Sequence, residues 1–216
     1  MYIGLSLLSN PNTRELHLEG RRILELLNES CFPGRGPEEI GTEKGGRPFF
    51  TAAHADFSIS HSRNIAAVAY GAEKKAGTGC DIQYVKPMKN CGEIARRYFS
   101  PEEQGYIAAA PGEPEQLERF YRIWVLKECF LKARGLSVFE MRTAPSFAGP
   151  EGLAVEVNAP LHFFLYELGE KGTERYLLAA AQENGGAYGP SPEFRWYSKG
   201  IHSPPPPVVQ SIKILC

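Results

Sequence analysis

One long amphipathic helix constrains this chain more than any other feature of its sequence. In RFYRIWVLKECFLKARG, residues 119–135, apolar side chains recur at helical spacing, and Gly135 follows two basic residues, as helix ends commonly show. Trp124, Glu128 and Lys132 stand at four-residue intervals, so they form one row along the helix. Because this row borders the apolar face, the helix must bury that face with the row at the edge of the contact.

Two interpretations of this row are open. A Glu–Lys pair four residues apart is common on exposed helices and stabilises them by about 0.2–0.5 kcal/mol. The alternative is a site in a cleft, where Glu128 serves a metal ion or a proton and Lys132 serves a phosphate. Lys127 favours the cleft, because it points toward the apolar side, where a lone lysine needs an anion or a route to solvent.

The composition is that of an ordinary globular protein. The chain has 216 residues, 43% hydrophobic and 23% charged, enough for one large domain or two small ones with a real core. Its net charge of −1 offers no general attraction for nucleic acid or a membrane surface, so we expect neither partner. We find no signal-peptide pattern and no apolar run of about 18 residues, the length that a membrane helix needs.

The cysteines favour a reducing compartment. There are five, without a CxxC pair: Cys31, Cys80, Cys91, Cys129 and Cys216. An odd number at irregular spacing argues against a disulfide framework and against a structural zinc site. Free thiols and the lack of a signal peptide together predict a cytoplasmic protein.

Segments with strand and helix patterns alternate along both halves of the chain. We expect strands at 2–8, 79–85 and within 153–181, a hairpin at 56–71, and helices at 13–31, 91–100, 101–110 and in the long helix already described, which follows a break at PGEPEQ. The polar, glycine-rich link near residue 75 predicts an N-terminal half over 1–75 and a C-terminal half over 76–184. A tail over 185–216, rich in glycine and proline, is expected to have little fixed structure. The predicted class is α/β (α+β) with two similar halves.

Two further polar clusters stand in apolar surroundings. Ser60-His61-Ser62 ends a predicted strand and offers donors for a phosphate, with turn chemistry and a surface histidine as the alternative. Adjacent residues point to opposite faces of a strand, so Ser60 and His61 are not a nucleophile and its base. Asp81 lies inside the apolar strand GCDIQYV, where a carboxylate requires an ion partner, a capping role or a metal.

Together these clusters suggest phosphoryl chemistry. Asp81 and Glu128 suit magnesium that is shared with substrate phosphates, and a lysine nearby suits the phosphates themselves. The GTG at 77–79 is neither a dinucleotide fingerprint nor a phosphate loop, because the third glycine and the GK[ST] sequence are missing.

Four motifs resemble the 4′-phosphopantetheinyl transferase superfamily, in its larger, pseudo-duplicated Sfp-type class. They are GRP at 46–48, FSISHS at 57–62, GCDI at 79–82 and WVLKECFLK at 124–132, and the last two are the specific ones. The resemblance covers about residues 14–182 and implies two similar halves, each a small antiparallel sheet with packed helices. It implies a monomer that transfers the 4′-phosphopantetheine group of coenzyme A to a serine of an apo acyl or peptidyl carrier protein. Mg²⁺, with Mn²⁺ as an alternative, would be required, and 3′,5′-ADP would leave.

The resemblance implies catalytic roles for four matching residues. Asp81 and Glu128 would hold the metal on the pyrophosphate. Glu128, directly or through a metal-bound water, would also accept the proton of the carrier serine. Lys132, assisted by Lys127, would stabilise the charge that grows on the pyrophosphate.

It also implies the contacts that hold coenzyme A. His61 with Ser60 would bind the 3′-phosphate, and Arg47 would contact the nucleotide phosphates. Trp124 would wall the site and fix the helix. Coenzyme A would lie in the cleft between the two halves.

The chain departs from the family pattern at two points. Many relatives have a third acid two residues after the strand aspartate, where this chain has Gln83, a poor ligand for magnesium. Larger relatives also carry a basic segment before the first helix, and here only Arg14, Arg21 and Arg22 are available. The metal preference and the strength of coenzyme A binding therefore stay open.

Two other functions remain as alternatives. The first is a non-catalytic descendant that binds coenzyme A or a nucleotide on the same fold. The second is an interaction protein whose SPPPP segment, at 203–207, recruits an aromatic-lined domain.

Overall fold

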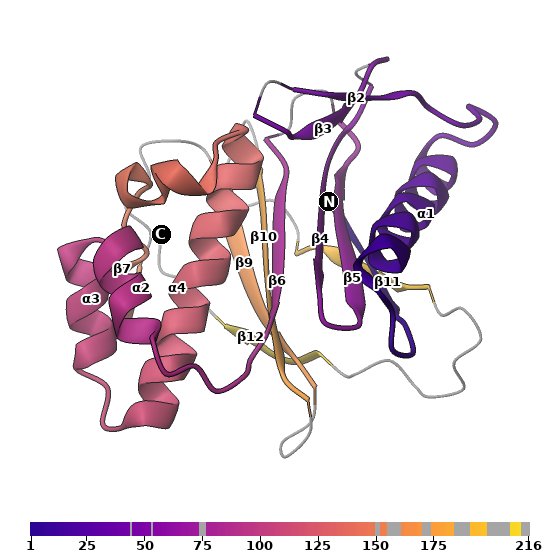
Figure 1. The fold of residues 1–216 in the computed structure, drawn as a ribbon. Helices are drawn as coiled ribbons and strands as arrows, with labels where there is room; N and C mark the ends of the chain where they lie inside the picture. The colour runs from indigo at the N-terminus through magenta and orange to yellow at the C-terminus, as the bar shows by residue number, and fades with distance from the viewer. Residues whose placement is uncertain are drawn as a thin grey trace.

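The protein folds into two halves, each with a four-stranded sheet; α1 (Thr13–Cys31) packs on one sheet, and the other helices lie with the second sheet (Figure 1). The computed structural model describes residues 1–43, 45–52, 54–73, 77–149, 152–154, 161–169, 174–183, 191–197 and 208–212. This confirms the predicted mixed α/β class with two similar halves. None of the helices in these ranges is both long enough and apolar enough to cross a membrane.

The N-terminal sheet has the strand order β11-β1-β5-β4. Its strands are β1 (Tyr2–Leu7), β4 (Asp56–Ser62), β5 (Ile65–Gly71) and β11 (Glu193–Trp196). All neighbours are antiparallel except β11, which runs parallel to β1. Helix α1 (Thr13–Cys31) covers one face, and Asn12 caps it through a reciprocal pair of hydrogen bonds with Glu15. A small hairpin, not foreseen in the glycine-rich stretch before residue 50, consists of β2 (Ile40–Thr42) and β3 (Pro48–Phe50).

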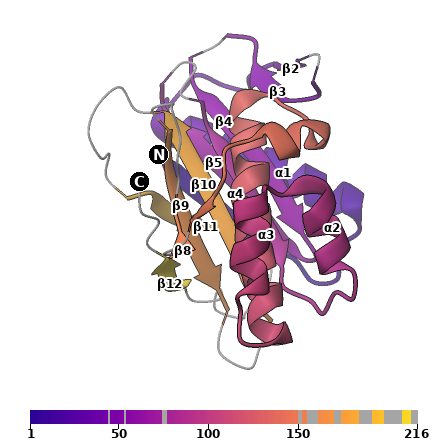
Figure 2. The same ribbon diagram turned by 90° about the vertical axis from the view of Figure 1, so that its left-hand side faces the viewer.

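The C-terminal sheet is antiparallel throughout, with the order β12-β9-β10-β6. Its strands are β6 (Gly79–Tyr84), β9 (Leu161–Leu168), β10 (Tyr176–Glu183) and β12 (Val208–Ile212). Helix α4 (Glu113–Arg134) lies on this sheet, with α2 (Cys91–Tyr98) and α3 (Pro101–Ala108) beside it (Figure 2). The remaining elements are the 3-10 helix η1 (Val138–Thr143) and the short pair β7 (Ala148–Gly149) and β8 (Gly152–Leu153).

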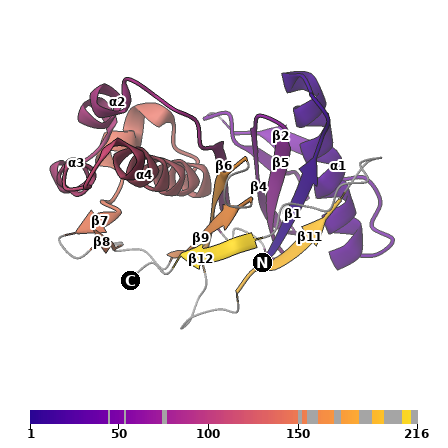
Figure 3. The ribbon, with the colours of Figure 1, turned by 90° about the horizontal axis from the view of Figure 1, so that it is seen from below.

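The two sheets face each other between the helices, so the molecule has four layers (Figure 3). Strand β5 shows the period of two that this requires. Ile65, Ala67 and Ala69 point into the core shared by the sheets. Their neighbours Ala66 and Val68 point to the core under α1. Every side chain of β5 is therefore buried, which explains its unbroken apolar sequence.

The structure differs from the expectations at two places. Within the tail, expected to have little fixed structure over 185–216, residues 193–196 and 208–212 form β11 and β12 at the edges of the two sheets. The break expected at PGEPEQ is shorter than predicted, because α4 already begins at Glu113. Pro114 fits in the first turn of this helix, where the N–H group that proline lacks would have no partner within the helix. The proline run at 204–207 and the expected boundary at 74–76 lie outside the described residues.

Gly79 sets how closely α4 approaches β6. A Cβ atom at this position would lie 2.1 Å from the carbonyl oxygen of Cys129 and 2.9 Å from the Cβ atom of Ala133. Its backbone is not in the left-handed region, so the requirement for glycine is one of space. Only glycine lets the helix backbone lie directly against the strand.

We predict that Gly79→Ala destabilises the protein by about 1–3 kcal/mol, because the added methyl group forces α4 away from β6. Gly105→Ala is the matched control, since no atom lies within 4 Å of a Cβ there and α3 is exposed at this point. The control should gain about 0.5–1 kcal/mol from the helix propensity of alanine. Urea unfolding of both variants measures this, and an unchanged midpoint for Gly79→Ala would show that the helix has room to shift.

Candidate active site

A pocket of about 520 Å³ opens between the two halves, where β4, β6, α1 and α4 meet. Its polar lining includes Ser60, His61, Asp81, Gln83, Glu128 and Lys132. Trp124 also lines it, so the whole row predicted along the long helix faces this pocket. Of the residues predicted for the site, only Arg47 and Lys127 are not part of the lining.

Asp81 is the most buried acid of the pocket, at 2% exposure. Lys132 Nζ donates to its Oδ1 at 2.6 Å, and the Ser60 hydroxyl donates to the same oxygen at 2.8 Å. Gln83 Nε2 donates to the other oxygen, Oδ2, at 3.1 Å. Both oxygens of Asp81 are therefore occupied by donors from β4, β6 and α4, and the ion pair that its burial required is with Lys132.

Lys132 stays protonated in this position. Burial alone would lower the pKa of Lys132, but its attraction to Asp81 and the hydrogen bond between them outweigh this and raise the pKa. The exposed Glu128–Lys132 pair that the spacing allows is not the arrangement found, because the lysine turns across the pocket to the strand.

Glu128 faces the pocket without a bonded partner. Within the described ranges, no hydrogen bond or ion pair reaches its carboxylate, although the side chain is half-buried. Burial raises the pKa of Glu128, the nearby charge of Asp81 raises it further, and Lys132 opposes both. A half-buried acid next to a second acid is an arrangement that a cation would stabilise.

Asp81 and Glu128 fit a magnesium ion that shares its coordination with a ligand. In the described part of the chain, no three or more His, Cys, Asp or Glu side chains are arranged so that they could hold a metal ion by themselves. Magnesium is commonly held by one or two carboxylates together with waters and substrate phosphates. Lys132 and Gln83 would have to release oxygens of Asp81, and a phosphate would offer the lysine a new partner.

Ser60 supports Asp81 and is not a free donor. Its oxygen accepts the Ile82 N–H at 3.2 Å and a proton of Lys132 at 3.1 Å, and its single hydroxyl proton points to Asp81. The predicted donation from Ser60 to a phosphate stays a prediction, and it would require the hydroxyl proton to leave Asp81.

His61 lies on the other face of β4, as the alternation of the strand requires, and meets α1. Its Nε2 atom is 3.4 Å from Nε2 of His17, and the two rings meet edge to face with their centroids 4.6 Å apart. Burial lowers the pKa of His61, and the proximity of His17 and Lys132 lowers it further. His17 and Arg21, one helical turn apart, both line the pocket and were not singled out as site residues from the sequence. Their four-residue spacing was the available signal.

Arg47 joins the two halves behind the pocket. Its Nη2 donates to Asp56 Oδ1 at 2.7 Å and to the carbonyl oxygen of Thr78 at 3.3 Å. Asp56 also accepts the Thr78 N–H at 2.8 Å. The neighbours Gly46 and Pro48 line the pocket, but the guanidinium itself is engaged with this carboxylate. The predicted contact between Arg47 and the nucleotide phosphates is therefore not supported.

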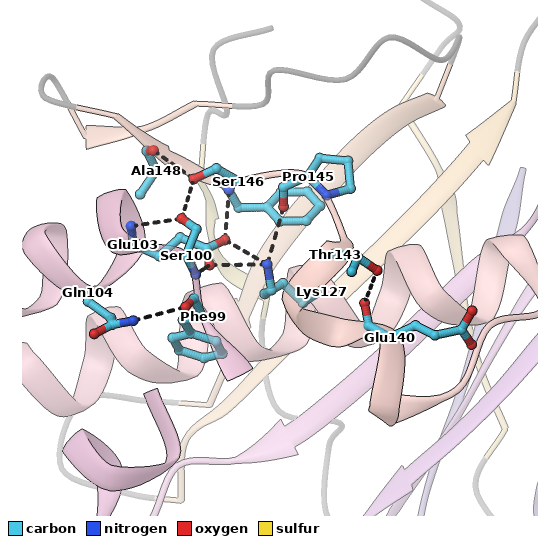
Figure 4. A network of polar contacts seen from close by, with 11 residues as sticks. Phe99, Ser100, Glu103, Gln104, Lys127, Glu140, Thr143, Pro145, Ser146 and Ala148 are labelled. Carbon is cyan, nitrogen blue, oxygen red and sulfur yellow. Dashed lines mark hydrogen bonds and ion pairs between the residues drawn. The ribbon is translucent and has the colours of Figure 1, made fainter. Parts of the chain in front are cut away.

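Lys127 turns toward α3, away from the pocket (Figure 4). Its side chain is completely buried, and Nζ lies 3.1 Å from Glu103 Oε2 and 3.3 Å from the carbonyl oxygen of Pro145. Glu103 also accepts the N–H groups of Ser100, at 2.8 Å, and of Phe147, at 2.9 Å. The anion that a lysine on the apolar side required is thus internal. The predicted phosphate role of Lys127 is corrected to a structural one.

We predict that Lys127→Met destabilises the protein by about 3–5 kcal/mol, because it leaves the charge of Glu103 buried without its cation. Lys127→Met combined with Glu103→Met should cost less than the sum of the two single changes. Unfolding in urea measures the stabilities, and calorimetry measures coenzyme A affinity. If folded Lys127→Met lost affinity for coenzyme A more than about tenfold, the phosphate role would be restored.

Comparison with known proteins agrees with this geometry. Residues 77–181 match the family model of the 4′-phosphopantetheinyl transferase superfamily. The chain is 31% identical over 130 residues to 4′-phosphopantetheinyl transferase HetI of Nostoc, an alignment that covers 58% of this chain and 54% of the relative. It is 34% identical over 133 residues to AcpT of Escherichia coli K12, covering 62% and 64%, and 35% identical over 97 residues to Sfp of Bacillus subtilis, covering 44% and 41%.

Residues 77–181, about half of the chain, are thus similar in sequence to the 4′-phosphopantetheinyl transferase superfamily. The matched segment contains Asp81, Glu128 and Lys132, the three residues that meet in the pocket. The alignments span less than two thirds of the length of each of these three relatives.

Proposed function

We propose that this protein transfers the 4′-phosphopantetheine group of coenzyme A to a serine of an acyl or peptidyl carrier protein. The observation that supports this most is the meeting of Asp81, Glu128 and Lys132 in one pocket, between halves that are brought together by β4 and β6. Three similar proteins that match the chain are named 4′-phosphopantetheinyl transferases. A monomeric, cytoplasmic protein is part of the same proposal.

In this proposal the carrier serine attacks the phosphorus that bears the pantetheine arm. A new phosphorus–oxygen bond forms to the serine, the pyrophosphate bridge breaks, and 3′,5′-ADP leaves. Glu128 takes the serine proton, a role that its raised pKa favours. Lys132, protonated and already in the pocket, moves from Asp81 to the leaving phosphate and balances its charge. Magnesium held by Asp81 and Glu128 would supply further charge neutralisation on the pyrophosphate.

His61 is the proposed contact of the 3′-phosphate of coenzyme A. It stands at the α1 end of the pocket, whereas the two acids stand at the α4 end. The pocket thus has a basic end with His17, Arg21 and His61, and an end where charges of both signs meet. A ligand with a phosphomonoester at one end and a metal-bound pyrophosphate at the other suits this division.

The alternative is a non-catalytic protein that binds coenzyme A. The replacement of a third acid by Gln83 favours it, because Gln83 donates to Asp81 and leaves the site with two acids. Transfer and binding are separated by the following experiment.

We predict that the protein adds one phosphopantetheine arm to at least one apo carrier protein when it is given coenzyme A and magnesium. The measurement is the intact mass of each member of a carrier panel. Asp81→Asn and Glu128→Gln should each lower the rate at least about 10²-fold, because each removes a charge from the reacting end of the pocket. Removal of magnesium by a chelator should abolish the reaction.

Glu25→Gln is the matched control, because Glu25 is exposed on α1 and does not line this pocket. Its rate should equal that of the unchanged protein. Coenzyme A binding without transfer to any carrier would support the non-catalytic alternative. Full activity of either site variant at limiting magnesium would refute the metal assignment.

We also predict that His61→Ala raises KM for coenzyme A more than KM for dephospho-coenzyme A, which lacks the 3′-phosphate. The physical reason is that the lost interaction is with a group that only one of the two substrates carries. Steady-state kinetics with both substrates measures the ratio. Equal effects on both KM values would refute the proposed contact between His61 and the 3′-phosphate.

A further inference from the structure

The hairpin of β2 and β3 forms one wall of the pocket, yet it belongs to neither of the four-stranded sheets (Figure 1). Each of its strands has three residues, and an isolated pair of such strands is not stable in water. The hairpin faces the pocket with Ile40, Thr42, Gly46 and Pro48. The shape of this wall therefore depends on what fixes the hairpin to the rest of the molecule.

Arg47 is the residue that anchors the hairpin. Among the described residues of 40–50, it alone makes a side-chain hydrogen bond to a residue outside the hairpin. Its guanidinium donates to Asp56 on β4 and to the carbonyl oxygen of Thr78, the residue before β6. The two neighbours of Arg47 in the chain both line the pocket, so any shift of Arg47 moves this wall directly.

Asp56 gives the anchor a fixed position. The residue is 6% exposed, and three donors reach its carboxylate. Arg47 Nη2 lies 2.7 Å from Oδ1, which also accepts the N–H of Phe57 at 2.9 Å. The other oxygen, Oδ2, accepts the N–H of Thr78 at 2.8 Å. Because backbone groups of two segments hold the carboxylate, it cannot follow a movement of the guanidinium.

We propose that Asp56 and Arg47 are positioning residues, which hold the hairpin as a wall against bound coenzyme A without contacting the ligand. This inference rests on the proposed function and adds Asp56 to it, a residue outside the lining of the pocket. The side chain of Arg47 is 16% exposed, and its bonds point to β4 and to the start of β6. The pair therefore acts on coenzyme A only through the shape of the wall.

The sign of the effect separates positioning from charge. Coenzyme A is an anion, so the loss of a nearby carboxylate should tighten its binding if electrostatics alone decided the affinity. Loss of the charge of Asp56 would also free Arg47 for a phosphate, if the arginine were a direct ligand. Positioning predicts the opposite result, because a hairpin without its anchor must be ordered when the ligand binds.

The test is calorimetry of the full chain with coenzyme A, without a carrier, at a temperature at which every variant is folded. Asp56→Asn keeps an oxygen for the Thr78 N–H, and we expect it to weaken the affinity for coenzyme A at least about fivefold. Arg47→Met should weaken it by a similar factor, and the two changes together by little more than either alone. Arg47→Lys keeps the charge without the planar fork and should restore only part of the affinity.

Arg35→Gln is the matched control, because it breaks another arginine–carboxylate pair close to the hairpin. Arg35 is exposed, and neither it nor its partner Glu38 lines this pocket. Its affinity for coenzyme A should equal that of the unchanged protein. Urea unfolding of every variant tests a merely structural role. A lower midpoint for Asp56→Asn with unchanged affinity would make the pair structural only and overturn the inference.

Transfer kinetics provide a second readout. Asp56→Asn should raise KM for coenzyme A and change kcat less than about twofold, because the reacting end of the pocket keeps its residues. Calorimetry decides the inference even if no carrier is modified. Coenzyme A that binds Asp56→Asn as tightly as the unchanged protein, or more tightly, would refute the positioning role and leave the proposed transfer intact. Absence of binding by the unchanged protein would refute the proposed function and the positioning role together.

Discussion

The close packing of α4 on β6 is the contact on which the rest of the site depends. At Gly79 the helix backbone occupies the space of a side chain, with Cys129 and Ala133 directly above the strand. Two residues further on, Asp81 points from β6 toward that helix, within 2.6 Å of Lys132. A longer separation would leave the aspartate buried without its cation. The glycine and the aspartate of the GCD sequence thus have one physical explanation.

A second constraint joins the halves. β4 and β6 are edge strands of different sheets, and the N–H groups along β6 would be unpaired where they meet. Polar side chains of β4 accept them instead. The pairs are Thr78 N–H to Asp56, Ile82 N–H to Ser60 and Tyr84 N–H to Ser62. This explains why a strand of an apolar core carries polar residues at every second position here, and it places Ser60 beside Asp81.

Some basic side chains that the sequence offers for a ligand are paired with carboxylates of the protein itself. Lys127 and Arg47 are basic residues in motifs of the family, and both are satisfied by carboxylates of this chain, Glu103 and Asp56. Glu128 remains without such a partner in the described residues, and its pKa is raised by burial and by Asp81. Shifted acids without an internal partner are common at functional sites, so Glu128 is the acid of this pocket that is open to a ligand.

The sequence alone determined the central elements of both halves and the row on the long helix. Spacing of two and of about 3.6 residues is local, so it predicts the β4–β5 hairpin, β6 and α4, and the Trp124–Glu128–Lys132 row follows from it. Only the tertiary structure decided which charges meet. The pairing of Lys132 with Asp81, the burial of Lys127 against Glu103 and the contact of His17 with His61 join residues far apart in the chain. Such contacts depend on how the sheets and helices pack, and no local sequence pattern encodes which distant residues come into contact.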